Sequence, residues 1–313
     1  PNFSYPTIHQ WNVTFEQTLP KSLVARVAYQ GSSGRNLFHA SELNAAVPGP
    51  GATIANTDSR RPRREFTQLT FAGTFGVSDY HALVLSVEKR FSGSLTFLGG
   101  LSWQKSTDLA SYTAFEGNLG QFPYGGQMGD HAVSDFHRAL RSTSSFNYRL
   151  PGPKTGALKQ ALGGWQLNGI IVLQSGAPLN VTDGFDNALT GIAGDRPSIV
   201  GNPALDNSRP RGERILKWFN TGAYQASAPG TFGNLGRNMQ RGPALASTDL
   251  SIFKAFVMPF SERHRLEFRA EFFNALNRVN LGNPNTNLTN SLYGRITSAG
   301  DPRILQLGLR YSF

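Results

Sequence analysis

The chain has 313 residues, a formal charge of +10, 11% aromatic residues, 34 glycines, 18 prolines and no cysteine. Without cysteine it can form no disulfide, thiolate metal site or cysteine nucleophile. Its apolar runs are far shorter than the roughly 18 residues of a membrane-spanning helix, which excludes helical spans but not β-strand spans, since these need only about 9–11 residues.

In the first half of the chain, apolar and polar residues alternate with a period of two, the pattern of a strand with one apolar face. The intervening residues 31–79 are rich in Gly, Ser, Asn, Pro and Arg, so we expect a long loop there, with strand character only at 66–75. The strands expected in this half cover residues 7–19, 23–30, 83–91 and 95–104.

The second half continues the pattern. A short helix is expected near residues 214–219, inside the longest loop, 175–244. The other long loops are 105–137 and 275–302, whereas 151–163 is a brief connection. The strands expected in this half cover residues 140–150, 165–174, 249–256, 266–272 and 303–313.

The connections between these nine expected strands alternate regularly between short and long. One end of the sheet is therefore closed by tight turns and the other carries long loops. Transmembrane β-barrels have this asymmetry, with short periplasmic turns and long extracellular loops. The pattern predicts an all-β, antiparallel transmembrane barrel, and a β-sandwich core is the weaker alternative.

Aromatic residues on the apolar face collect at both strand ends, as in the aromatic belts at lipid–water interfaces. At the turn end they are Phe91, Tyr148, Trp165, Phe256, Tyr311 and Phe313, and at the loop end Trp11, Tyr29 and Trp103. The opposite face carries charges that suit an aqueous or plugged lumen, namely Glu88, Arg90, Arg141, Arg149, Glu267, Arg269 and Glu271.

The last segment, RILQLGLRYSF, has the same alternation and ends on an aromatic residue. The apolar residues of its lipid-facing side are Leu305, Leu307, Leu309, Tyr311 and Phe313. This face is typical of a strand that closes a barrel against lipid.

Several stretches together resemble the C-terminal barrel of TonB-dependent outer-membrane receptors, in particular the Oar-like group that often carries a carboxypeptidase-regulatory-like domain. They are Ser78–Ser92, Gly163–Pro178, Trp218–Tyr224, Gly230–Pro243, Phe268–Asn277 and Pro302–Phe313. The resemblance covers nearly all of residues 1–313 and implies the distal part of a 22-stranded plugged barrel. The plug, the energy-coupling box and the regulatory domain that the family carries would lie upstream of Pro1.

The resemblance also implies a location and partners. The location is the Gram-negative outer membrane, and the partners are outer-membrane lipid and lipopolysaccharide, an unidentified substrate, and the TonB complex through the upstream part. The barrel assembly machinery is thought to recognise a terminal strand of this kind, which makes the five residues of its apolar face an expected membrane-insertion signal. A passive porin or structural barrel, and a secreted glycan-binding β-sandwich, are the alternatives.

The chain contains no nucleophile elbow, phosphate-binding loop or dinucleotide fingerprint, so we expect neither an enzyme nor a cofactor. Asp130, His131, Asp135 and His137 lack the spacing of a metal site, and we interpret them as part of a polar loop. The basic residues are scattered, which argues against nucleic acid. The one cluster is Arg60, Arg61, Arg63 and Arg64, a possible anion-binding loop that we interpret first as a solvated segment.

Overall fold

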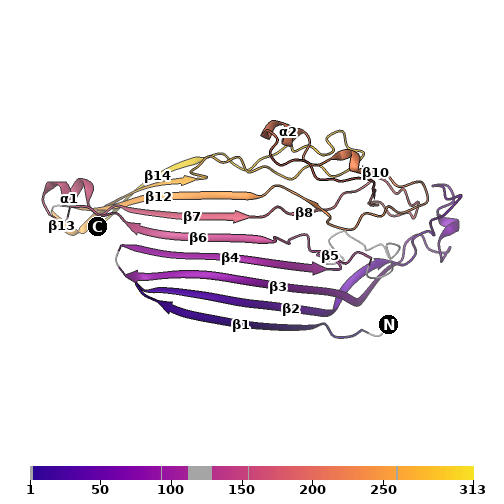
Figure 1. Cartoon of the computed structure of the whole chain (residues 1–313), viewed down its shortest axis with the longest axis horizontal. Helices are drawn as coiled ribbons and strands as arrows, with labels where there is room; N and C mark the ends of the chain where they lie inside the picture. Colours follow the sequence, from indigo (N-terminus) through magenta and orange to yellow (C-terminus); the bar gives the residue numbers. More distant parts are fainter. Residues whose placement is uncertain (1–2, 93, 112–128, 154, 259) are drawn as a thin grey trace.

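The structure is a computed structural model that describes residues 3–92, 94–111, 129–153, 155–258 and 260–313. Its dominant feature is one antiparallel sheet in which nine long strands follow one another in chain order (Figure 1). They are β1 (Thr7–Leu19), β2 (Leu23–Glu42), β3 (Thr70–Ser92), β4 (Leu95–Asp108), β6 (Leu140–Arg149), β7 (Gln166–Gln174), β12 (Leu245–Met258), β13 (Ser261–Phe273) and β14 (Ile304–Ser312). The nine expected strands and the all-β class are confirmed.

Short elements occupy the connections. A strand of two residues, β5 (Ala132–Val133), extends the main sheet beside β4. Two small strand pairs lie in the longest loop, β8 (Pro178–Leu179) with β11 (Gln240–Arg241) and β9 (Ser198–Ile199) with β10 (Tyr224–Gln225). Single 3-10 turns cover Asp58–Arg60 and Thr221–Ala223.

The described residues also contain two short α-helices. The helix expected near residues 214–219 is α2 (Arg211–Leu216), which begins and ends earlier than predicted. The other, α1 (Ala157–Leu162), lies in the connection 151–163, where no helix was expected. Its sequence, ALKQAL, consists of good helix formers between two glycines, but six residues are too few to show a helical period.

The predicted asymmetry of the connections is confirmed. The short turns and α1 lie at the same end as the C-terminus, on the left of Figure 1, and the long loops lie at the other end. Within the described ranges, no helix is long and apolar enough to cross a membrane.

The hairpin of β2 and β3 extends well beyond the other strands. The expected loop 31–79 is therefore wrong at 31–42 and at 76–79, whereas the strand character expected at 66–75 is confirmed from Thr70 onward. The pairing continues from Leu23 opposite Lys89 to Glu42 opposite Thr70. Strands of 20 and 23 residues are about twice as long as a bilayer crossing needs. Outside the lipid, strand pairing does not require alternating apolar residues. Register shifts near Leu37 also interrupt the period of two, so the sequence pattern does not reveal this part of the strands.

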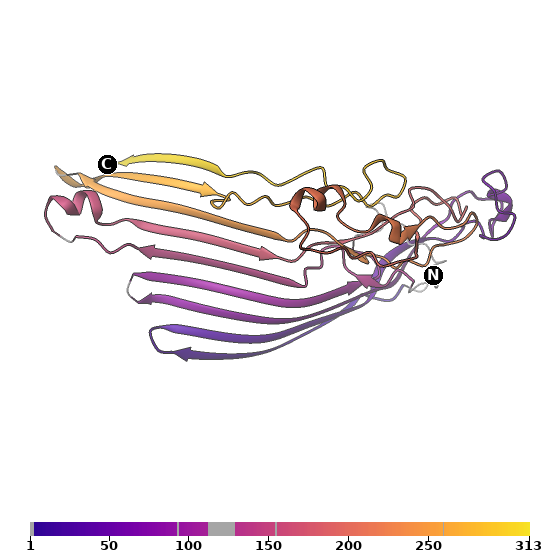
Figure 2. The same ribbon diagram turned by 45° about the horizontal axis from the view of Figure 1, so that its top comes forward.

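The sheet is curved but not closed, since β1 and β14 form its two edges (Figure 2). Hydrocarbon offers no water to unpaired backbone groups, so a sheet with open edges is not stable alone in a bilayer. The nine strands are therefore part of a larger barrel.

Two glycines on the outer face lie directly opposite aromatic residues of the next strand. Gly31 pairs with Trp11, and a Cβ added to Gly31 would lie 2.2 Å from the Trp11 ring. Gly169 pairs with Phe146, and a Cβ there would lie 2.3 Å from the Phe146 ring. Each ring thus covers the glycine beside it, an arrangement that pins strand register.

Candidate functional site

Two neighbouring rows of residues across five strands show how the faces of the sheet differ. The outer row is Phe146, Gly169, Leu250, Phe272 and Leu305. The inner row, one residue along each strand, is Asn147, Asn168, Ser251, Glu271 and Gln306. The first row suits lipid, and the second suits a water-filled lumen.

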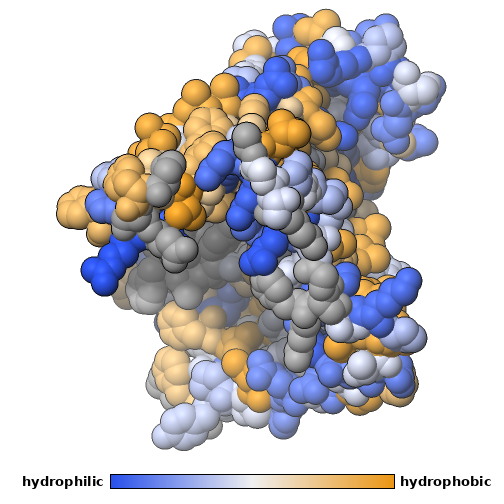
Figure 3. Space-filling model, turned by 90° about the vertical axis from the view of Figure 1, so that its left-hand side faces the viewer, coloured by the Kyte–Doolittle hydropathy of each residue, from blue (hydrophilic) through white to orange (hydrophobic). Residues whose placement is uncertain are grey.

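The inner row is joined by side-chain hydrogen bonds. The Asn147 amide donates to Asn168 Oδ1 at 2.5 Å, and the Asn168 amide donates to Ser251 Oγ at 3.1 Å. Further along the same face, Arg26 Nε donates to Glu16 Oε2 at 2.9 Å. These links satisfy polar groups across the wall and leave its surface hydrophilic. Figure 3, seen from the short-turn end, shows hydrophobic residues gathered at the upper left and hydrophilic residues at the upper right, with the two kinds mixed in the lower part.

Aromatic side chains lie at both rims of the outer face. At the loop end, Tyr29 OH and His81 Nδ1 are 2.8 Å apart, and the Trp11 ring lies 6.0 Å from the His81 ring. At the turn end, Tyr311 OH lies 2.6 Å from His264 Nδ1. These contacts match the predicted belts. The side chains of Arg90 and Phe91, expected in the lumen and the turn-end belt, lie outside the described part.

The apolar face of the terminal strand β14 is open to the surroundings. Leu305, Leu307 and Leu309 are 55%, 65% and 70% exposed. Tyr311 is also exposed, and Phe313 is 90% exposed at the end of the chain. Residues of the opposite face of this edge strand are exposed as well, so the strand register decides the assignment: Leu305 pairs with Phe272 and Leu307 with Ala270, which places the leucines on the outer face as predicted. Their role as an insertion signal stays a prediction.

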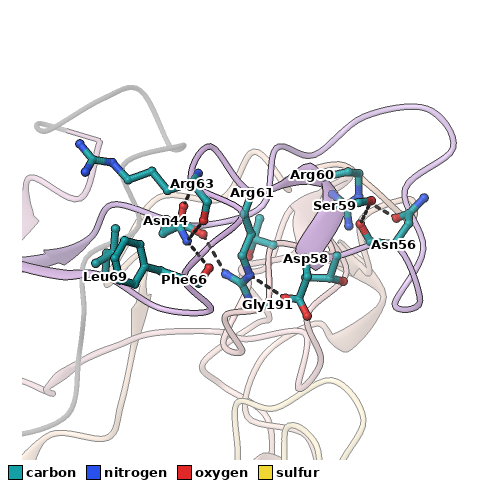
Figure 4. Close-up of polar contacts among 12 residues, drawn as sticks. Asn44, Asn56, Asp58, Ser59, Arg60, Arg61, Arg63, Phe66, Leu69 and Gly191 are labelled. Carbon is teal, nitrogen blue, oxygen red and sulfur yellow. Dashed lines mark hydrogen bonds and ion pairs between the residues drawn. The ribbon is translucent and has the colours of Figure 1, made fainter.

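The four arginines of the predicted anion-binding loop divide into two kinds, and Figure 4 shows Arg60, Arg61 and Arg63. Arg60 donates from Nε to Asn56 Oδ1 at 2.7 Å and from Nη2 to Leu189 O at 2.6 Å. Arg61 donates to Asp58 Oδ1 and to Asn44 O, both at 2.8 Å. Arg60 and Arg61 therefore hold the β2–β3 loop together and fasten it to the loop after β7.

The backbone around this cluster is arranged to receive it. Gly191 has a φ of +82°, and a Cβ there would lie 2.6 Å from Arg61 Nη2, so only glycine leaves room for the guanidinium. The buried Asn44 binds the backbone of Arg63 in both directions, through Oδ1 at 2.9 Å and Nδ2 at 2.9 Å. The side chains of Arg63 and Arg64 are exposed. These two are the arginines left for an external anion.

A second ionic network joins the β4–β6 loop to the loop after β7. Arg237 forms an ion pair with Asp108, donates from Nε to Asp130 O at 3.0 Å, and lies 3.4 Å from Asp135 Oδ1. Arg196 donates to Asp130 Oδ1 at 2.6 Å. Because most of these groups are buried, removing one partner would leave a charge uncompensated.

This network also accounts for the loop residues weighed as metal ligands. Asp130 and Asp135 bind arginines, His137 Nδ1 accepts from Ser106 N at 3.3 Å, and His131 is exposed. Among the residues that the structure describes, no group of three or more His, Asp or Glu side chains is placed to hold a metal ion.

Comparison with known protein families identifies the family of this chain. The model described as "Outer membrane beta barrel domain" matches residues 1–306. The chain belongs to this family of outer-membrane β-barrel domains. As such a domain, it lies in the outer membrane of a Gram-negative cell, with the outer face of its sheet against lipid. No curated protein matches it.

One solved transporter structure shares the fold of this outer-membrane barrel domain, and two others align with it at lower scores. The outer membrane transporter YddB from Escherichia coli aligns with a TM-score of 0.51 and 12% identity, over 99% of this chain and 33% of YddB. P. aeruginosa FpvA bound to heterologous pyoverdines aligns with a TM-score of 0.44 and 12% identity, over 98% of this chain and 27% of that protein. In the FpvAI–pyocin S2 complex the TM-score is 0.44, the identity 12%, and the coverage 98% and 28%. This chain thus spans about a third of the length of YddB.

The long loops of the barrel domain have a hydrophobic core of their own, which the sequence analysis missed. Phe219 is 1% exposed and packs edge-to-face on Tyr224 and Tyr293, with ring centroids 5.7 and 5.3 Å away. Val181 and Leu235 are buried beside it. The core joins the loop after β7 to the β13–β14 loop. Its signal was the aromatic content of the WFNTGAY stretch, which is high for a solvated loop.

One cation on the outer face was also missed. Lys254 of β12 has the parity of Ile252 and Phe256, which points it away from the lumen. It is 2% exposed, and its Nζ donates to Ala161 O at 2.9 Å and to Gln160 O. The Nζ also lies 4.5 Å from the centre of the Phe256 ring. Lys254 thus fastens the C-terminal end of α1 to the wall at the turn end.

Proposed function

We propose that this domain is part of the wall of a TonB-dependent transporter of the Oar-like group, and that the intact protein moves a substrate across the outer membrane. In this proposal the nine strands line a path through the barrel. The long loops form the outer surface that first meets the substrate. No catalytic step is assigned to these residues.

The observation that carries the proposal is a hydrophilic row across the inner wall of an incomplete barrel. The row from Asn147 to Gln306 crosses five strands without an apolar side chain. Such a wall needs a wide lumen, because polar groups against a dry core would be destabilising. The similar share of YddB, a third of a transporter, supports a large barrel.

In this proposal, residues outside 1–313 supply the other barrel strands and the plug of the transporter. We propose that β1 and β14 pair with further strands, and that an upstream plug fills the lumen and contacts the TonB complex. Energy from the inner membrane would then move the plug and open the path. A passive porin is the second candidate, since a hydrophilic wall alone would also suit an unplugged channel.

Channel conductance separates these two candidates. The full-length protein, inserted into planar bilayers, should show a closed barrel, and removal of the plug should produce a large aqueous conductance. A permanently open channel in the intact protein would contradict the transporter and favour the porin.

We also propose that Arg63 and Arg64 contact an anionic group, either a lipopolysaccharide phosphate or an anionic ligand. The double change Arg63→Gln/Arg64→Gln should weaken binding of purified lipopolysaccharide to the full-length protein. A matched control is Arg211→Gln, an exposed arginine on another extracellular loop. Equal loss in the control would mean that only net charge matters, and would contradict a site at Arg63 and Arg64.

A further inference from the structure

Two aspartates in the loop after β7 are completely buried. Asp183 and Asp195 are both 0% exposed, and Asp183 N donates to Asp195 O at 2.8 Å. This backbone hydrogen bond places the two residues side by side. A pair of carboxylates in such a position requires compensation, because a buried charge without a partner is strongly destabilising.

Each carboxylate satisfies only one of its oxygens. Asp183 Oδ2 accepts from Asn187 Nδ2 at 2.7 Å and from Ser227 Oγ at 3.0 Å. Asp195 Oδ2 accepts from Ala188 N at 2.7 Å. The two carboxylates therefore accept hydrogen bonds from the same short stretch, residues 187–188. Their Oδ1 atoms are enclosed, and neither has a hydrogen-bond partner among the described residues.

Two more enclosed oxygens of the same loop core share this condition. Tyr293 OH and Asn180 Oδ1 have no hydrogen-bond partner within the described part of the chain. The Tyr293 ring packs on Phe219, in the core that includes Val181. The segment that carries Tyr293 runs beside the one that carries Asp183: Leu288 N donates to Thr182 O at 3.0 Å, and Asn285 forms a β-bridge with Tyr293. Enclosed oxygens without partners on adjoining loop segments are the donor atoms that a bound ligand would use.

The charge of the region indicates what kind of ligand would fit. Both carboxylates are fully buried, and the hydrogen-bond partners named above are neutral amide, hydroxyl and backbone groups. An internal water would bring no positive charge. One shared proton would neutralise only one of the two carboxylates. A hard divalent cation compensates both carboxylates at neutral pH, and calcium accepts carboxylate, amide and water oxygens in a flexible shell.

We propose that Asp183 and Asp195 bind a calcium ion through their Oδ1 atoms, and that this ion holds the extracellular loop core in its folded form. Two carboxylates are fewer than the three charged groups of many metal sites. Neutral oxygens complete the shell, and Asn180 Oδ1 is the candidate nearest in sequence. The site is independent of the transport proposal, since it depends only on the geometry of the loop.

Terbium luminescence tests the site in the full-length protein purified in detergent. Tb³⁺ replaces Ca²⁺ at oxygen sites, and the nearby Tyr293 and Tyr224 would sensitise its emission. We expect a saturable signal that Ca²⁺ displaces. Asp195→Asn and Asp183→Asn should each reduce the affinity at least as much as the roughly 10- to 100-fold loss typical of an outer-shell partner. Asp206→Asn, a change at an exposed aspartate of the same loop, is the matched control and should bind as the parent does.

A second measurement needs no variant, which guards against a substitution that simply misfolds. The unaltered protein is digested with a protease in excess Ca²⁺ and in a chelator, and cleavage within residues 180–240 is followed. Calcium should protect the loop. The proposal is overturned if no displaceable Tb³⁺ signal appears, if Asp195→Asn binds like the parent, or if the chelator leaves cleavage unchanged. In that case a water or a proton fills the space.

Discussion

Leu307→Arg tests the assignment of the two faces most directly. Leu307 lies beside the middle of β14, is 65% exposed, and pairs with Ala270 on the outer face. An arginine there would have to reside in hydrocarbon or reach for a rim. For a lipid-facing residue at mid-membrane the cost is about 2–4 kcal/mol, which corresponds to a roughly 30- to 900-fold shift of the folding equilibrium.

The adjacent residue supplies a matched control. Gln306 lies on the inner face opposite Glu271, so Gln306→Arg adds the same side chain to the same strand but beside a carboxylate. We expect that change to be close to neutral, because cross-strand pairs of opposite charge contribute about 0.2–1 kcal/mol.

The assay is equilibrium unfolding of the full-length protein by denaturant in lipid vesicles, with heat-modifiable electrophoretic mobility as the folding readout. The result that refutes the reasoning is equal stability of the two variants, or a greater loss for Gln306→Arg. Either outcome would mean that the leucines of β14 do not face lipid.

Three further predictions concern other parts of the barrel. Deletion of Phe313 should slow membrane insertion without changing the final fold, as followed by the rate at which protease-resistant barrel accumulates; an unchanged rate would argue against a terminal insertion signal. Lys254→Met should free α1, so that cleavage within residues 151–164 increases while the barrel keeps its stability, and unchanged cleavage would show that the lysine does not hold the helix. In the calcium-free protein, burial and then the negative charges of Asp186 and Asp183 raise the pKa of Asp195 to about 6, so the folded loop retains a proton that the unfolded loop has released. Loop stability, measured by protease resistance, should therefore fall as pH rises from about 4 to about 6, with Asp186 and Asp183 as the neighbouring titratable groups, and Asp195→Asn should abolish this slope.

The parts of the fold that could be predicted are those where the bilayer imposes a pattern. A strand such as β14 must present alternate residues to lipid. Its period, its two faces and its ends can therefore be predicted from the segment RILQLGLRYSF alone. The same constraint makes the short and long connections alternate. In these segments the lipid, rather than packing against distant parts of the chain, determines which positions are apolar, so the pattern is visible in the local sequence.

The extracellular half lacks that constraint, and there the sequence was much less informative. The extension of β2 beyond Gln30 lies outside the lipid, where alternation is not required, and its last residues, from His39 to Glu42, are buried on both faces. Arg60 and Arg61 are held by hydrogen bonds to Leu189 O and Asn44 O. These partners are far away in the sequence, so no local pattern predicts the contacts. The burial of Asp183 and Asp195 likewise follows from the packing of distant loop segments.

The glycine–aromatic pairs of the outer face have a consequence for how this wall can change during evolution. Gly31 cannot gain a methyl group unless the Trp11 ring moves, and the Trp11 ring cannot be lost without exposing the backbone at Gly31. The same holds for Gly169 and Phe146. The two residues of each pair therefore depend on each other across two strands. In homologous barrels the two positions should change together rather than one at a time.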